Sequence, residues 1–131
     1  MTASNSSAGL RGISAGTTAI ATVGSEGAGL RYRGYDVADL AAHASFESVA
    51  WLLLHGELPD SSELQTFREG LVQRRALPGA VREVLERVPA DTHPMDVLRT
   101  GCSMLGTIEP EGDFSRQQDV AMRLISTLPS M

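Results

Sequence analysis

Residues 93–106 read HPMDVLRTGCSMLG, and this stretch decides how the rest of the chain is interpreted. Pro94 suits the first turn of a helix, because its missing N–H would have no helical partner there. Met95, Leu98, Cys102 and Leu105 then recur at helical spacing and predict one apolar side. An apolar helix side must pack against another element, and the neighbouring segments also have helical patterns, so the stretch predicts a helix within a helical fold.

Capping residues predict further helices on both sides of this one. Asp36 and Ser45 are placed to cap helices over about 37–44 and 46–55, and Gly56 and Pro59 would end the second. That second helix is apolar around most of its circumference, so we expect it to be enclosed on most sides. The remaining signals are a capping box at Asp60 and Glu63, an apolar stripe over 81–88 closed by Pro89, and a second capping box at Ser115 and Gln118.

The N-terminal part has a different pattern. Residues 17–23 are rich in β-branched side chains, residues 30–33 alternate apolar and basic, and the glycine-rich segment 24–29 lies between them. A glycine-rich loop can also hold a phosphate, but this one joins two strands and lacks the lysine of the usual motif. The prediction is therefore an all-α fold with a short N-terminal β-hairpin, preceded by a flexible tail over residues 1–9.

Composition excludes several classes of function. All 11 basic residues are arginine, so Schiff-base and phosphate-loop lysine chemistry is excluded. The net charge is -5 and the sequence has no run of basic residues, which argues against nucleic acid as a partner. The longest apolar run, 49–54, is too short to cross a membrane. A single cysteine and the absence of a targeting signal indicate the cytoplasm.

Few residues are candidates for chemistry. His43 and His55 lie near predicted helix ends, where a cation is favoured, and a structural role is expected for both. His93, flanked by Asp91 and Asp96, suggests a polarised imidazole or half of a metal site, although capping is the simpler interpretation. Cys102 lies on an apolar helix side and is expected to be buried. We therefore expect no catalytic residue, no metal ligand and no cofactor.

Four segments in a fixed order resemble the citrate synthase family, and within it most closely the bacterial 2-methylcitrate synthases. They are GTTAIATVG at 16–24, YRGYD at 32–36, WLLLHGELP at 51–59 and residues 93–106. The resemblance covers residues from about Gly9 to Met131. It implies that residues 10–131 form an incomplete, N-terminal part of the family's helical large domain.

The family condenses an acyl-CoA, propionyl-CoA or acetyl-CoA, with oxaloacetate and then hydrolyses the thioester, as a homodimer. An aspartate, two histidines and several arginines carry that reaction, and they come from segments beyond the point that matches Met131. The resemblance therefore implies a scaffold and dimerisation fragment without turnover, with the helix over 94–106 in the dimer interface. Arg11 matches a position that contacts the CoA phosphates in some branches.

Two other interpretations stay open at this stage. The chain can be a stand-alone helical module that has lost catalysis and pairs with a full-length relative. A generic helical domain with an unrelated function would require the ordered match to be accidental. The short last predicted helix, followed closely by Met131, has little after it to cover its apolar side, which favours a truncated chain.

Overall fold

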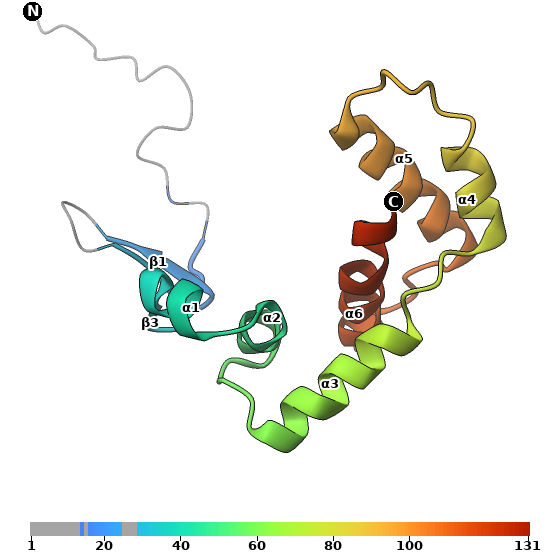
Figure 1. Cartoon of the computed structure of the whole chain (residues 1–131). Coiled ribbons are helices and arrows are strands. Elements are labelled where there is room, and N and C mark those ends of the chain that lie inside the picture. Colours follow the sequence, from blue (N-terminus) through green and yellow to red (C-terminus); the bar gives the residue numbers. More distant parts are fainter. Residues whose placement is uncertain (1–13, 15, 25–28) are drawn as a thin grey trace, which may run out of the picture. The chain divides into compact units, whose positions relative to one another are not determined.

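The computed structural model describes Ser14, residues 16–24 and residues 29–131. The chain divides into two compact units, one ending at Ala44 and the other spanning Ser45–Met131. Within the described residues, six α-helices and one small antiparallel sheet are present, coloured along the chain in Figure 1. The predicted tail over residues 1–9 and most of the glycine-rich segment lie outside the described residues.

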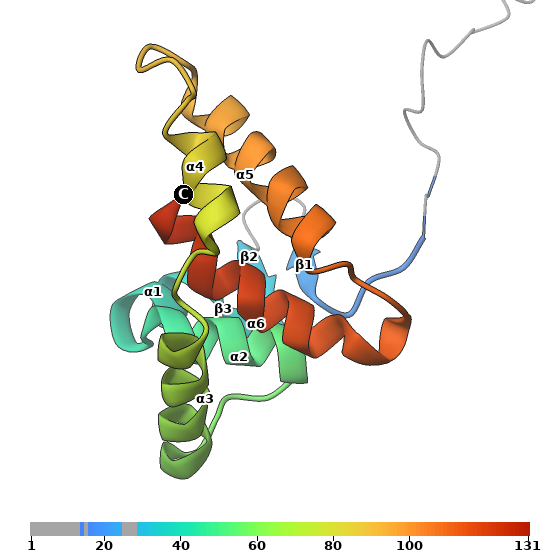
Figure 2. The ribbon, with the colours of Figure 1, turned by 90° about the vertical axis from the view of Figure 1, so that its right-hand side faces the viewer.

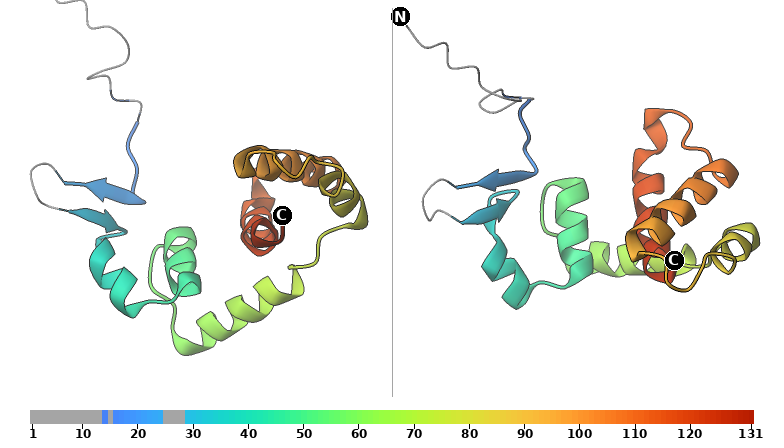
Figure 3. Two further views of the ribbon diagram at one scale, coloured as in Figure 1. Left: turned by 45° about the horizontal axis from the view of Figure 1, so that its top comes forward. Right: turned by 90° about the horizontal axis from the view of Figure 1, so that it is seen from above.

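The first unit contains the sheet and one helix. Strands β1 (Ala21–Val23) and β2 (Leu30–Tyr32) pair antiparallel, with Ala21 opposite Tyr32. The predicted hairpin is confirmed, but a third strand, β3 (Tyr35–Asp36), also pairs with β2. Arg33 and Gly34 both have positive φ, 48° and 92°, which is the backbone of the tight turn that reverses a hairpin. The left view of Figure 3 shows the strands leading into the first helix.

Helix α1 (Val37–His43) follows the sheet directly. The Asp36 carboxylate accepts a bond of 2.8 Å from the Ala38 amide, so the predicted N-cap is confirmed. Leu40 is the buried residue of this helix. The unit is therefore a small sheet extended by a two-turn helix.

The second unit begins with two helices joined by a short connection. Helix α2 (Phe46–His55) is capped by Ser45 and ends at Gly56, which adopts φ +100°. Helix α3 (Ser61–Gln73) starts with the predicted capping box between Asp60 and Glu63. The expected enclosure of α2 is wrong for this chain. Only Leu52 is fully buried, while Phe46 is 70% exposed, because α3 covers just one side.

The remaining helices complete the second unit. Helix α4 (Gly79–Leu85) lies beside α5 (Pro94–Ile108), as Figure 2 shows, and α6 (Gln117–Thr127) packs on α3. Short 3₁₀ turns, η1 (Phe114–Arg116) and η2 (Leu128–Ser130), flank α6. The buried apolar residues come from several of these helices: Leu52, Phe67, Leu71, Val81 and Leu105.

Two local predictions in this region have opposite outcomes. Pro94 occupies the first turn of α5, as predicted. The capping box at Ser115 and Gln118 is wrong. The Asp113 carboxylate instead accepts from the Ser115 amide at 2.9 Å and starts η1, so α6 begins at Gln117 without a side-chain cap. The Asp113 carboxylate accepts from the Ser115 hydroxyl as well as from its amide, so neither group of Ser115 is left for a capping box with Gln118.

Candidate functional site

The three histidines are all bonded to backbone groups of their own helices. Nδ1 of His43 lies 3.1 Å from the Asp39 carbonyl oxygen, and Nδ1 of His55 lies 3.2 Å from the Trp51 carbonyl oxygen. His93 has the opposite role, because its Nδ1 accepts a bond of 3.2 Å from the Met95 amide at the start of α5. Each imidazole therefore stabilises a helix end, which is the structural role expected of His43 and His55.

The residues around His93 do not assemble a metal site. Asp96 pairs with Arg99 at 3.0 Å, one turn along α5. No group of three histidine, cysteine or carboxylate side chains within the described residues is placed to hold a metal ion. Cys102 is half-buried rather than fully buried as predicted. His93 is therefore the N-cap of α5.

A cavity of about 580 Å³ lies between α5, α6 and the end of α3. Its apolar side is formed by Leu105, Val120 and Leu124, and Cys102 also lines it. The charged residues around it are three arginines and three carboxylates: Arg74, Arg116, Arg123, Glu109, Glu111 and Asp119. No histidine is among the residues that line it.

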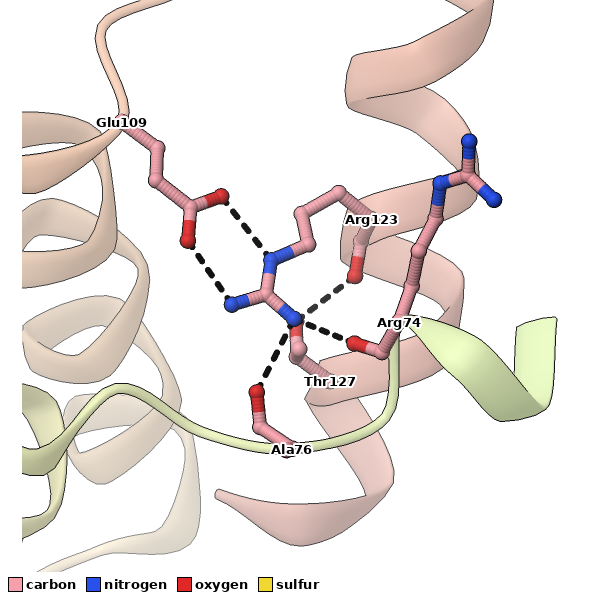
Figure 4. Close-up of polar contacts among 5 residues, drawn as sticks. All are labelled: Arg74, Ala76, Glu109, Arg123 and Thr127. Atoms are coloured by element: carbon pink, nitrogen blue, oxygen red, sulfur yellow. Dashed lines mark hydrogen bonds and ion pairs between the residues drawn. The ribbon is translucent and has the colours of Figure 1, made fainter. Parts of the chain in front are cut away.

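Arg123, on α6, holds several segments together at this cavity (Figure 4). Its Nε and Nη2 donate to the two oxygens of Glu109 at 2.9 and 2.8 Å, a bidentate pair. Its Nη1 donates to the carbonyl oxygen of Arg74 and, at 3.0 Å, to that of Ala76. The guanidinium therefore links the end of α5 to the chain between α3 and α4.

The charges around Arg123 are largely neutralised by one another. Hydrogen bonding to Arg123 lowers the pKa of Glu109 below its ordinary value, and the nearby charges of Arg123 and Arg116 act in the same direction, while partial burial opposes them. Arg74 lies 3.4 Å from Asp119. A carboxylate held ionised in this way is a poor proton donor or acceptor at neutral pH. The arrangement favours structural support over acid–base chemistry.

Comparison with known proteins gives the family. A family model described as "Citrate synthase, C-terminal domain" matches residues 9–131. The chain belongs to the citrate synthase family. It is 59% identical to the 2-methylcitrate synthase of Shewanella oneidensis over 95% of its length, and 43% identical to that of Mycobacterium tuberculosis over 94%. Those alignments cover 33% and 32% of the relatives, so the chain spans about a third of their length.

A solved structure supports the same family assignment. It is a ternary complex of carboxymethyl coenzyme A and oxaloacetate with the citrate synthase of Thermoplasma acidophilum. The TM-score is 0.82 and the identity 25%, over 90% of this chain and 32% of that one. The predicted fold class, an all-α, citrate synthase-like fold with a short N-terminal β-hairpin, is thereby confirmed, with β3 added to the hairpin.

The one predicted binding residue of this citrate synthase family member cannot be placed in the structure. Arg11, the predicted contact of the CoA phosphates, lies outside the described residues. The Arg123 and Glu109 pair was not predicted, because its partners are 14 residues apart across a loop and no sequence spacing marks such a pair.

Within the part of the chain that the structure describes, no helix has the length and apolar character needed to cross a membrane.

Proposed function

We propose that this chain is a scaffold and dimerisation part of a cytoplasmic 2-methylcitrate or citrate synthase. The complete enzyme would condense propionyl-CoA or acetyl-CoA with oxaloacetate, releasing 2-methylcitrate or citrate and CoA. The supporting observation is the 59% identity to a 2-methylcitrate synthase over 95% of this chain. Residues 10–131 would form the opening part of the large domain.

The reaction demands groups that neither unit, within its described residues, brings together. Removing a proton next to a thioester needs an oriented base, and the developing oxygen charge needs preorganised hydrogen-bond donors. In the described residues, His43, His55 and His93 lie at three different helix ends, each bonded to its own helix. The chain alone is therefore proposed to have no turnover.

A thioester-cleavage assay tests this part of the proposal. The purified chain is mixed with oxaloacetate and either propionyl-CoA or acetyl-CoA, and free thiol is followed by a colorimetric reagent. The full-length Shewanella oneidensis relative, assayed in parallel, is the positive control. We expect no thiol release above background from the chain alone. Release at a rate comparable with the control enzyme would overturn the proposed inactivity.

The proposed self-pairing surface is the outer side of α5. Met95 is 64% exposed, although it is a large apolar residue on this helix. Covering it with the same helix of a second copy would remove that apolar surface from water. In the complete enzyme, Arg11 would then contribute to binding the CoA phosphates.

Sedimentation equilibrium tests the pairing. Met95→Glu places a charge on the proposed interface and is expected to make the chain monomeric. Val72→Glu is the matched control, since Val72 is 60% exposed on α3 and lies away from α5 in sequence. Loss of the dimer in both variants, or in neither, would contradict the assignment of the interface to α5.

A further inference from the structure

The cavity between α5, α6 and the end of α3 has the size and the lining of a small-molecule site. Its volume of about 580 Å³ lies within the range of roughly 300–1,000 Å³ that ligand pockets occupy. One wall is apolar and consists of Leu105 of α5 with Val120 and Leu124 of α6. Charged side chains make up most of the remaining lining. An occupant therefore needs an apolar part together with charges that match those of the cavity.

Four of the six charged residues of the cavity neutralise one another in pairs. Arg123 holds Glu109 through two hydrogen bonds of 2.9 and 2.8 Å, which use both carboxylate oxygens (Figure 4). Arg74 donates to the carboxylate of Asp119 at 3.4 Å. Because each pair carries no net charge, neither pair strongly attracts a charged ligand.

The two other charged residues of the cavity, Arg116 and Glu111, have opposite signs. Both line the cavity and both are exposed. No ion pair among the described residues includes either side chain. The charge of Arg116 acts on the carboxylates of Glu109 and Asp113 only at longer range. The cavity therefore offers one guanidinium, with its five N–H donors, and one carboxylate to a ligand.

A zwitterion matches these two charges better than an ion of either sign. A simple anion would be attracted by Arg116 and repelled by Glu111, and a simple cation would experience the reverse. An α-amino acid carries a carboxylate and an ammonium on one carbon, so it can pair with both residues while its side chain covers the apolar wall. We propose that this cavity binds a free α-amino acid with a large aliphatic side chain, its carboxylate on Arg116 and its ammonium on Glu111.

The preference for an aliphatic side chain follows from the wall of the cavity. Leucine and valine form it, and no aromatic ring is among the described residues that line the cavity. Binding there needs neither thioester cleavage nor pairing through α5. A failure of this proposal would therefore leave the proposed function untouched, and the reverse also holds.

Isothermal titration calorimetry of the 131-residue chain with L-leucine tests the proposal, with three analogues as matched ligands. 4-Methylpentanoate lacks the ammonium, 3-methylbutylamine lacks the carboxylate, and glycine lacks the aliphatic side chain. Leucine should bind with a dissociation constant on the order of 1 mM, given its small size. Each analogue should bind about tenfold more weakly, because it loses one charged partner or the apolar contact. Absence of saturable leucine binding, or an analogue that binds as well as leucine, would overturn the proposal.

Two variants locate the ligand within the cavity. Arg116→Gln should weaken leucine binding about tenfold and leave the binding of 3-methylbutylamine unchanged. Glu111→Gln should also weaken leucine binding, but it should not weaken that of 4-methylpentanoate. Arg82→Gln is the control, since Arg82 is exposed on α4 and does not line this cavity. Wild-type affinity for leucine in both cavity variants would refute the assignment to these residues.

Cys102 supplies a readout in the wild-type chain, because it lines the cavity and is the single cysteine. Alkylation of its thiol by iodoacetamide should slow as leucine is added, with half-protection near the dissociation constant found by calorimetry. If a variant does not fold, this protection and the analogue series still decide. An unchanged alkylation rate at saturating leucine would show that the ligand binds elsewhere and would contradict the proposal.

Discussion

Replacing Arg123 by methionine should destabilise the second unit more than any exposed arginine substitution. The guanidinium makes a bidentate pair with Glu109 and donates to the carbonyl oxygens of Arg74 and Ala76. Its side chain is 19% exposed. Methionine keeps most of the aliphatic stem, so the substitution isolates the polar contacts.

The magnitude follows from the partners that are left behind. Each backbone carbonyl loses a bond worth about 1 kcal/mol. The Glu109 carboxylate is 40% exposed and can be rehydrated, so its share is about 0.5–1 kcal/mol rather than that of a fully buried pair. The expected loss in the free energy of unfolding is therefore about 2.5–3 kcal/mol.

Urea unfolding followed by circular dichroism measures this loss as a lower midpoint with an unchanged slope. Arg99→Met is the control, because Arg99 pairs with Asp96 at a similar distance, 3.0 Å, but is 79% exposed. That variant should change stability by less than about 0.5 kcal/mol. Equal losses in the two variants would refute the view that Arg123 is a structural tie.

Four further substitutions test local features. Glu109→Gln should lower stability by a constant amount above about pH 5. Because the pKa of Glu109 is below its ordinary value of 4.5, the difference from wild type should shrink as the pH falls through the folded pKa, which urea midpoints from pH 3 to 7 will test. Gly106→Ala should raise the thermal midpoint, by up to about 0.5–1 kcal/mol of stability, since nothing lies within 4 Å of the added Cβ in the last turn of α5. The same change at Gly56 should instead lower it, because φ there is +100°. Asp60→Ala should cost about 1 kcal/mol in urea unfolding by removing the acceptor of two amides, and an unchanged midpoint would contradict that role.

Helix boundaries were predictable from the sequence where the deciding contact is local. Asp36, Ser45 and Asp60 each bond an amide two or three residues away, so the residue type and its position suffice. Gly56 and Pro94 act through their own backbone geometry and need no partner at all. These are the features that sequence reasoning placed correctly.

Competition between nearby groups and long-range contacts were not predictable. Asp113 and Ser115 are both good caps, and only the coordinates show that the aspartate takes the amide. The third strand depends on two consecutive residues with positive φ, one of which is an arginine that rarely adopts it. The predicted enclosure of α2 was wrong because an apolar circumference shows only that a helix can be buried. Whether it is buried depends on neighbouring elements, which the sequence of α2 itself does not specify.

Long-range contacts also limited what could be predicted of the candidate site. The three histidines were singled out correctly, since their places at helix ends follow from the caps and breakers around them. Arg123 was not, because its role depends on Glu109 and on two carbonyls 47 and 49 residues away. An arginine with many donors acquires its function from whichever acceptors the fold assembles.

The backbone bonds of the histidines also bear on what this segment can contribute to catalysis. A catalytic imidazole needs one nitrogen oriented by the protein and the other facing a substrate. His43 and His55 meet the first condition, since Nδ1 donates to a carbonyl and Nε2 remains open. In the described part of the chain, no hydrogen bond or ion pair joins either ring to a titratable side chain, so neither ring has a second catalytic group beside it.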